Sequence, residues 1–283
     1  MSKADHGAWD ELGQQKDPSW YLDPLVAAQK REAHLRLIQQ VCHGMPAPRL
    51  VLKTDLFEEA FGADQLLGDF PIAAGRLCGI DTAVSTTTHA GRRFAHLRGG
   101  LAAADLRRLP FRDGSFDLII STSSLDHFDT EAELAEALNE LARVLAPGGA
   151  LLMTFDNGWN PFYYLLRWSS AAGLFPFPLG RTPSPGRLPG MMRRLGLEPL
   201  GQDWLIHNPR GLSTLLFLGL RRLLGWRAGS LIAALIRSFA RLERLPTRRW
   251  TACFAAVWAR KEYAGSDAGI AAERPRQVGA LLP

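Results

Sequence analysis

The sequence predicts an α/β fold, a mostly parallel sheet with helices on both faces. Segments with the apolar pattern of strands alternate with segments of helical periodicity along the chain, and this alternation is typical of parallel sheets. In addition, 47% of the 283 residues are hydrophobic, which is enough to bury a sizeable core. One core domain with insertions is therefore expected in preference to two domains.

The N-terminal part begins with a helix expected at residues 24–43, where apolar residues recur among charges. Such an amphipathic helix could cover the mouth of a binding site. Strands are expected at 49–54 and 76–81, with a helix between them at 57–67. The second of these strands ends in Asp81.

The middle of the chain continues the alternation. A helix is expected at 84–93, a short third strand at 100–104, a fourth strand at 116–121 and a fifth at 150–155. The spacing predicts that this part of the chain adds three parallel strands to the sheet.

The helix before the fifth strand has clear boundary signals. Thr130 is expected to be its N-cap because Glu133 follows three residues later. Gly148 is expected to stop it. Its apolar face is formed by leucines at helical spacing, namely Leu134, Leu138, Leu141 and Leu145.

The C-terminal part adds an insertion, a short helix and two further strands to this pattern. Residues 157–187 are rich in Pro, Gly and aromatic residues without clear periodicity, so we expect an insertion over the active site. A short helix is expected at 187–195, and the sixth and seventh strands at 197–206 and 251–260.

A basic, leucine-rich segment lies between the last two strands. Residues 210–250 hold nine arginines against Glu243 alone, a net charge of +8, whereas the rest of the chain carries −3. Two helices are expected here, at 212–224 and 230–244. This local charge favours a surface such as an anionic membrane over nucleic acid. Entry of a lipid-linked substrate, a dimer face and simple core packing are the other interpretations, and the oligomeric state stays open.

The sequence also divides into parts by composition. The expected organisation is an N-terminal segment with a cap helix at 1–45, a core domain at 46–264 with insertions at about 157–187 and 208–249, and a disordered tail at 265–283. Three widely spaced cysteines predict neither a disulfide framework nor a metal site, and residues 1–17 lack the apolar core of a signal peptide. A cytoplasmic protein is expected, at the inner face of the membrane if the basic segment binds one.

Two segments of the sequence resemble the motifs of a known family. Segment 109–121 contains Leu-Pro-Phe and Ser-Phe-Asp, and segment 145–152 contains a Pro-Gly-Gly turn, both in register with the acid at Asp81. The chain thereby resembles the class I S-adenosylmethionine-dependent methyltransferases, in particular those of type 11, with a divergent first motif. The resemblance implies a Rossmann-like sheet of seven strands and S-adenosyl-L-methionine as cofactor. In that family the sixth and seventh strands usually form a close pair, so the helical insertion before the last strand is an addition to the fold.

The resemblance also assigns cofactor-binding residues. Asp81, followed by Thr82, matches the acid that accepts hydrogen bonds from the ribose hydroxyls, and a capping aspartate is the alternative. Asp105 falls where the family places an acid for the adenine amino group, with Leu106 packing on the ring. A loop aspartate that bonds its own backbone is the alternative for Asp105. Ser121 ends the fourth strand and is the next candidate.

The first motif departs from the family. Residues 51–62 contain no glycine before Gly62, and Lys53 occupies the place of the usual acid. A cation there would oppose binding of a cationic sulfonium unless Lys53 turns away or meets a carboxylate. We expect Asp55, with help from Glu58, to replace the missing acid, and a favourable helix start is the alternative.

Methyl transfer is an in-line displacement that needs few side chains beyond positioning and removal of a proton. His127 is the candidate general base, oriented by Asp126 or Asp129, although a structural helix-start histidine fits equally well. Asp156 and Asn157 follow the fifth strand and could bond a hydroxyl acceptor, with loop capping as the alternative.

Aromatic residues suggest where an acceptor binds. Trp159 and Tyr163 belong to an aromatic run in the 157–187 insertion that could wall an apolar substrate pocket, unless these rings only pack the insertion onto the body. The leading prediction is methyl transfer to a hydroxyl of a small apolar or lipid-linked metabolite, ahead of an amine or carbon. The alternative is a catalytically silent methyltransferase-like binding protein. A nicotinamide-dependent reductase ranks last because the Gly-x-Gly-x-x-Gly loop is absent.

Overall fold

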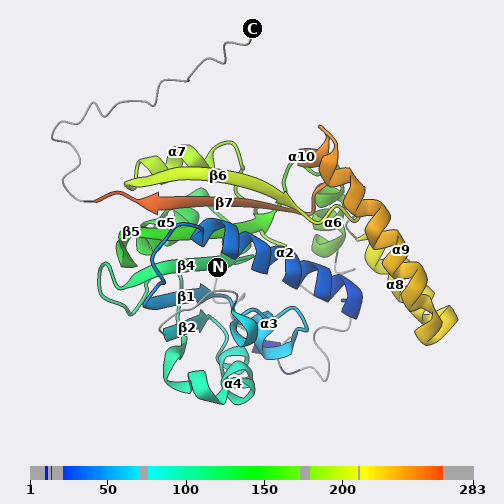
Figure 1. Cartoon of the computed structure of the whole chain (residues 1–283), viewed down its shortest axis with the longest axis horizontal. Coiled ribbons are helices and arrows are strands. Elements are labelled where there is room, and N and C mark those ends of the chain that lie inside the picture. The colour runs from blue at the N-terminus through cyan, green and yellow to red at the C-terminus, as the bar shows by residue number, and fades with distance from the viewer. Residues whose placement is uncertain are drawn as a thin grey trace, which may run out of the picture.

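The computed structural model describes residues 10–11, 14, 22–70, 76–172, 179–209 and 211–263. A single seven-stranded sheet with the order β3-β2-β1-β4-β5-β7-β6 crosses the molecule, and β7 runs antiparallel to both of its neighbours (Figure 1). The predicted Rossmann-like α/β class is confirmed. The strands are β1 (Leu50–Thr54), β2 (Arg76–Asp81), β3 (Leu101–Ala103), β4 (Phe116–Thr122), β5 (Leu145–Asp156), β6 (Leu197–Leu205) and β7 (Phe254–Lys261).

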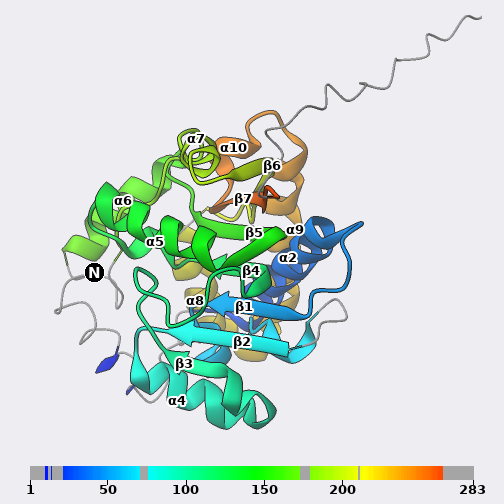
Figure 2. The ribbon, with the colours of Figure 1, turned by 90° about the vertical axis from the view of Figure 1, so that its left-hand side faces the viewer.

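Helices cover both faces of the sheet (Figure 2). On one face α5 (Glu131–Val144) and α7 (Leu188–Arg193) pack on the core that includes β4 and β5. On the other face lies α2 (Pro24–Cys42), which buries Leu37 and Ile38 against the sheet. The expectation that this helix caps a binding-site mouth is wrong, because its apolar stripe packs on the sheet face.

Two predicted boundaries differ from the structure. Helix α3 (Phe57–Phe61) is shorter than expected, since the chain turns extended at Gly62 and forms only a 3₁₀ turn at Leu67–Asp69. Helix α5 has the predicted capping box at Thr130, but it ends at Val144 and not at Gly148. Strand β5 starts at once with Leu145 opposite Phe116, so the Pro-Gly-Gly turn is an irregularity inside the ladder.

The predicted insertion contains regular structure that the sequence pattern does not indicate. Helix α6 (Pro161–Ala171) begins with Asn160 as N-cap, whose side chain accepts from the Phe162 N–H, and with proline in its first turn. Residues 173–178 of the insertion and the predicted tail at 265–283 lie outside the described residues.

The basic segment forms a helical hairpin at one end of the sheet. Helices α8 (Leu212–Leu224) and α9 (Ala228–Ala240) run beside one another at the edge of the body, and α10 (Arg248–Thr251) leads back to β7 (Figure 1). Because β6 is parallel to β5, α8 leaves the sheet at the edge where the parallel strands end. The remaining helix, α4 (Val84–Arg93), packs on α3 beyond β2.

Candidate functional site

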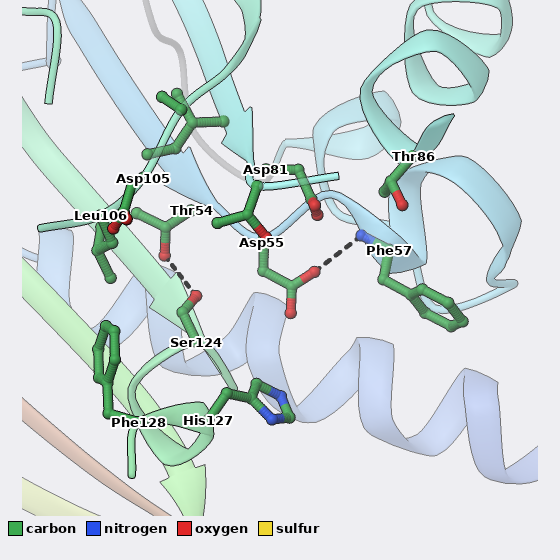
Figure 3. A pocket seen from close by; sticks show the side chains of 13 residues that line it. Thr54, Asp55, Phe57, Asp81, Thr86, Asp105, Leu106, Ser124, His127 and Phe128 are labelled. Atoms are coloured by element: carbon green, nitrogen blue, oxygen red, sulfur yellow. Dashed lines mark hydrogen bonds between the residues drawn. The ribbon is translucent and has the colours of Figure 1, made fainter. Parts of the chain in front are cut away.

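An open cavity of about 650 Å³ lies at the carboxyl ends of β1, β2 and β4 (Figure 3). This is the position where strand order reverses from β1 to β4, and open α/β sheets bind ligands there. The lining residues are Thr54, Asp55, Phe57, Ile80, Asp81, Thr82, Thr86, Ala104, Asp105, Leu106, Ser124, His127 and Phe128.

Asp81 lies at the end of β2 with both carboxylate oxygens engaged. Oδ2 accepts from the Leu56 N–H at 2.9 Å and Oδ1 accepts from the Ala83 N–H at 2.8 Å. Burial raises the pKa of Asp81 to about 6, against the lowering effect of these two N–H groups. Asp81 therefore lines the pocket and bonds the backbone just before α4, while α4 itself begins without a side-chain cap.

Asp55 forms the turn directly after β1. Its φ is +70°, a left-handed conformation that aspartate tolerates better than most residues, and its Oδ1 accepts from the Phe57 N–H at 2.8 Å. Figure 3 shows its carboxylate in the centre of the pocket, between Asp81 and His127. Burial, followed by the charge of Glu58, raises the pKa of Asp55 well above its ordinary value.

Lys53 points away from this pocket. Its side chain is 1% exposed, and Nζ lies 2.7 Å from Glu59 Oε2, 3.8 Å from Glu58 Oε2, and donates to the backbone carbonyl of Asp55. Burial alone would lower the pKa of Lys53, but the two carboxylates raise it above its ordinary value. Lys53 therefore both turns away from the pocket and meets carboxylates, so its charge does not oppose a cationic cofactor there.

A second cation completes this buried network below the turn. Lys30 of α2 lies 2.7 Å from Glu58 Oε1 and 2.8 Å from Asp64 Oδ2. Although burial opposes it, Lys30 and then Lys53 lower the pKa of Glu58 to about 2. Glu58 does not line the pocket, so the structure corrects the expectation that it assists Asp55 at the cofactor; its charge is paired with the two lysines.

The two residues that the resemblance assigns to the adenine, Asp105 and Leu106, line the cavity. Thr82, which follows Asp81, lines it too. The Asp105 carboxylate also accepts from the Arg107 backbone N–H at 2.8 Å and pairs with its guanidinium at 2.7 Å. Asp105 thus bonds its own loop as well as facing the pocket.

Ser121 does not line the cavity, which corrects one predicted cofactor residue. Its side chain is fully buried, and its Oγ accepts from Thr54 Oγ1 at 2.9 Å. Thr54 Oγ1 lies 2.7 Å from Ser124 Oγ, and these two hydroxyls reach the pocket instead. The polar run after β4 is recognisable from the sequence, but the residue of the run that faces the ligand depends on a turn at Ser123, whose φ is +51°.

The two predicted catalytic residues are separated by the structure. His127 lines the pocket, and its Nε2 is 3.8 Å from Asp126 Oδ1. Asp156 is buried at the end of β5, outside the lining residues, and its backbone N–H donates to Asp126 Oδ2 at 2.8 Å. Asp126 therefore connects the two loops, while His127 alone of the pair faces the cavity.

The predicted substrate residues serve the structure of the insertion. Asn157 is fully buried; its Nδ2 donates to the carbonyls of Arg249 and Ala252, and its Oδ1 accepts from the Trp159 N–H. Trp159 stacks on Trp204 with ring centroids 5.3 Å apart. The Tyr163 hydroxyl donates to the Gly180 carbonyl. Neither Asn157 nor Trp159 nor Tyr163 lines the described cavity.

Several lining residues were not predicted. Thr54, Phe57, Ser124 and Phe128 each lie within three residues of a predicted site residue or strand end, but their orientation depends on the local turns. Thr86 reaches the cavity from the first turn of α4. Among the described lining residues, three are aspartates and none is Lys or Arg, so the cavity suits a ligand with cationic groups.

The sheet order and the acidic pocket at its carboxyl edge define the class I methyltransferase fold. Residues 60–153 match the family model described as "Methyltransferase domain". This match, over about a third of the chain, and the shared fold support a class I S-adenosylmethionine-dependent methyltransferase. The match begins at residue 60, near the end of the divergent first motif, so it carries no information about Lys53 or Asp55.

Relatives among curated proteins overlap this chain only in part. The mouse "Probable tRNA methyltransferase 9B" is 51% identical over 49 residues, which are 17% of this chain and 11% of that protein. Because the overlap spans about a tenth of that relative's length, it does not transfer a substrate.

Solved structures share the fold at low identity. The [4+2]-cyclase SpnF superposes with a TM-score of 0.54 at 20% identity, covering 91% of this chain and 92% of that one. The N-methyltransferase NodS from Bradyrhizobium japonicum, solved with S-adenosyl-L-homocysteine, superposes with a TM-score of 0.54 at 15% identity, covering 92% and 99%. At such identities the likeness shows the fold alone.

Proposed function

We propose that the protein transfers a methyl group from S-adenosyl-L-methionine to a hydroxyl of a small apolar or lipid-linked metabolite. The observation that carries the proposal is the pair Asp55 and Asp81 in a cavity from which Lys53 is turned away. A cofactor with a sulfonium and an ammonium group is favoured by negative charge near its binding site, as any cation is.

The residues of the pocket fit this cofactor. Asp81 retains lone pairs for the ribose hydroxyls beside the two N–H groups that orient it, since a carboxylate offers about four acceptor sites. Leu106 and Phe128 offer apolar surface for an adenine ring, and Asp55 offers charge for the amino acid part. When bound, the cofactor supplies an electrophilic methyl group.

The chain's own contribution to transfer is positioning and proton removal. His127 reaches the cavity from the loop after β4, and a neutral imidazole there can accept the proton of a hydroxyl as it attacks. Asp126 lies beside the ring and could hold it in place. Asp156 supports this loop through its backbone N–H, which gives it a positioning role in the proposal.

Calorimetric titration with S-adenosylmethionine and S-adenosylhomocysteine tests the cofactor site. Asp81→Ala should weaken binding of both at least about tenfold, because hydrogen bonds to a buried charged acceptor are lost. Asp69→Ala is the matched control, since that carboxylate is 66% exposed and pairs with Arg31 outside the pocket. Wild-type protein that binds neither ligand at millimolar concentration refutes the proposal.

A catalytically silent binding protein is the alternative, motivated by the first motif without glycines. The likeness to a protein named as a cyclase is in keeping with the rule that one fold can serve several functions. Binding of the cofactor without turnover over any apolar alcohol, amine or transfer RNA offered would support this alternative. Transfer RNA belongs in that panel because of the mouse relative's name.

We also propose that the protein works in a reducing compartment, the cytoplasm. Within the described part of the chain Cys42, Cys78 and Cys253 form no disulfide; the Cys253 thiol donates to the Asn208 carbonyl, and burial raises the pKa of Cys42 to about 11. Such thiols react slowly, which suits a structural role.

A further inference from the structure

Helices α8 and α9 expose large apolar side chains, which are normally buried in a protein that is surrounded by water. Along α8 the residues at positions i, i+3, i+4 and i+11 face outward, and the stripe continues into the turn before α9. Leu223 is 82% exposed and Trp226 is 83% exposed. The other members of this outward stripe are Leu212, Leu215, Leu216 and Leu224.

The hairpin is nonetheless firmly docked through its inner side. Phe217 and Ile232 are buried in a cluster with Leu25 and Val26 at the start of α2. The Arg221 guanidinium pairs with Asp23, the N-cap of α2, at 2.7 Å. The exposed stripe is therefore a second apolar face, separate from the one that attaches the hairpin to the body.

The hairpin also exposes arginines, at its turn and along α9, namely Arg222, Arg227, Arg237, Arg241 and Arg244. The 210–250 segment holds a single acid, Glu243, and carries +8. Apolar side chains next to exposed arginines, with a tryptophan at the tip, are the features of helices that lie in the interface of an anionic membrane.

The hairpin does not have the geometry of a membrane span. By length and composition the stretch Leu212–Arg244 is apolar enough to cross a bilayer, and only 11% of its most apolar window is buried in the protein. The chain reverses at Gly225, however, where φ is +57°. Each helix has 13 residues, or roughly 20 Å, against roughly 30 Å of hydrocarbon.

We propose that the α8–α9 hairpin docks the protein on the surface of an anionic lipid bilayer, with the Leu223 and Trp226 tip in the interface. A second copy of the chain fits less well, because a two-fold contact between hairpins would bring arginine against arginine with one acid per copy. Nucleic acid would use the arginines but leaves the leucine stripe without a partner.

Helix α6 lies beside the start of α8 and also exposes apolar side chains. A side chain at Gly211 would meet Leu166 Cδ1 at 3.3 Å, so α6 lies against the start of α8. Its outer face exposes Tyr164, Leu165 and Trp168, by 60%, 52% and 65%. Tyrosine and tryptophan are the aromatic residues preferred at membrane interfaces.

The hairpin leaves the sheet at the edge where the cofactor pocket opens, since both lie at the carboxyl ends of the parallel strands. If the protein is the methyltransferase proposed above, docking would present the pocket to acceptors dissolved in the bilayer. The docking surface itself does not depend on that proposal, and its test needs neither cofactor nor acceptor.

Vesicle flotation provides the test, with full-length protein and liposomes of phosphatidylcholine alone or with roughly a third of phosphatidylglycerol. The protein should float with the anionic vesicles, and binding should fall severalfold at 1 M salt, where the Debye length is about 3 Å. The double variant Leu223→Ser/Trp226→Ser should bind at least about tenfold more weakly while keeping its charge. Arg222→Gln/Arg227→Gln should weaken binding to anionic vesicles and remove part of the salt dependence.

Matched controls come from outside the hairpin. Leu200→Ser removes a leucine that is 52% exposed on β6, and Arg193→Gln removes an arginine that is 60% exposed on α7. Neither should change flotation. Equal binding by wild type and the Leu223→Ser/Trp226→Ser variant overturns the proposal, as does a dimer in light scattering that this variant converts to monomer, or tighter binding to RNA than to anionic vesicles.

Discussion

Proteins usually bury apolar side chains and expose charged ones, and two regions of this molecule depart from that rule. The segment at the turn after β1 buries charged side chains, whereas the α8–α9 hairpin exposes apolar ones. Below the turn, four charged side chains are at most 17% exposed and pair with one another: Lys30, Lys53, Glu58 and Glu59. On the hairpin, leucines and a tryptophan are up to 83% exposed beside arginines. One region places charge inside, and the other places apolar surface outside.

The comparison separates two kinds of constraint. Buried charges are tolerated only when they are paired, so the network near the turn is tied to the stability of the fold. Exposed leucines contribute little to stability, so their presence points to something outside the chain. Substitutions in the two regions should therefore differ in what they change.

The largest expected effect is on stability, from Glu59→Gln. Glu59 is fully buried, and its loss leaves Lys53 without its nearest carboxylate at 2.7 Å. The free energy of unfolding should fall by about 3–5 kcal/mol, as for other broken buried pairs. A glutamine at this position can still accept from the Leu66 N–H, as Glu59 Oε1 does at 2.9 Å, so the charge is the main change. Urea unfolding followed by circular dichroism measures the loss.

Two further variants sharpen that result. Lys53→Met combined with Glu59→Gln removes both charges and should lose less stability than Glu59→Gln alone. Arg36→Gln breaks an ion pair with Glu32 in which both side chains are about two-thirds exposed, and it should leave the unfolding curve unchanged. An unfolding midpoint for Glu59→Gln equal to wild type would contradict the picture of a necessary buried pair.

The next effect is on the pH dependence of cofactor affinity. Burial raises the pKa of Asp81 to about 6, so the carboxylate becomes mostly ionised only as pH rises through that value. Since the ionised form accepts the ribose hydrogen bonds, affinity for S-adenosylmethionine should increase about tenfold from pH 5 to pH 7. Calorimetry in buffers of different ionisation enthalpy should show proton release on binding near pH 6. Affinity that is flat across this range would argue against a titrating acid in the site.

A smaller effect isolates the charge of Asp55. An asparagine at this position would tolerate the left-handed turn and still accept from the Phe57 N–H, so Asp55→Asn changes charge with little change in backbone. Affinity for S-adenosylmethionine and for S-adenosylhomocysteine should each fall about five- to tenfold, because both ligands carry the ammonium group of the amino acid part. Unchanged affinity for both ligands would assign Asp55 a purely structural role.

The smallest expected effect is on the stability of hairpin variants. Leu223→Ser removes a side chain that is 82% exposed, so thermal unfolding should shift by no more than about 1–2 °C. Phe217→Ala, less than two turns earlier on α8, removes a buried ring and should cost about 3–5 kcal/mol. A similar cost for both variants would mean that the outward stripe has an intramolecular partner.

The sheet was predictable because its strands carry continuous apolar runs and clear ends. Strand β2 was predicted to the residue, since Asp81 closes a short apolar run, and the capping box at Thr130 fixed the start of α5. The end of α5 was missed because the Pro-Gly-Gly turn, a helix stop by composition, lies within the ladder of β5 and β4. Helix α6 was missed because its aromatic residues face both ways and give no clear period.

The site was predictable where a residue ends a strand and less so where a turn intervenes. Asp55 and Asp81 follow β1 and β2 directly, and both face the pocket. Ser124 was missed in favour of Ser121 because the positive φ at Ser123 decides which hydroxyl points inward. The partners of Lys53 could not be chosen from sequence, since Glu58 and Glu59 are adjacent and only the packing of α3 separates their directions.

Helix α2 touches both of the regions compared above. Asp23 at its start holds Arg221 of the hairpin, and Lys30, roughly 10 Å further along the helix, holds Glu58 and Asp64 beneath the turn that carries Asp55. Binding free energies at two linked sites are reciprocal. A surface that moved one end of α2 on binding would therefore change the affinity for the cofactor at the other end. By reciprocity, cofactor binding would change the affinity for that surface by the same factor.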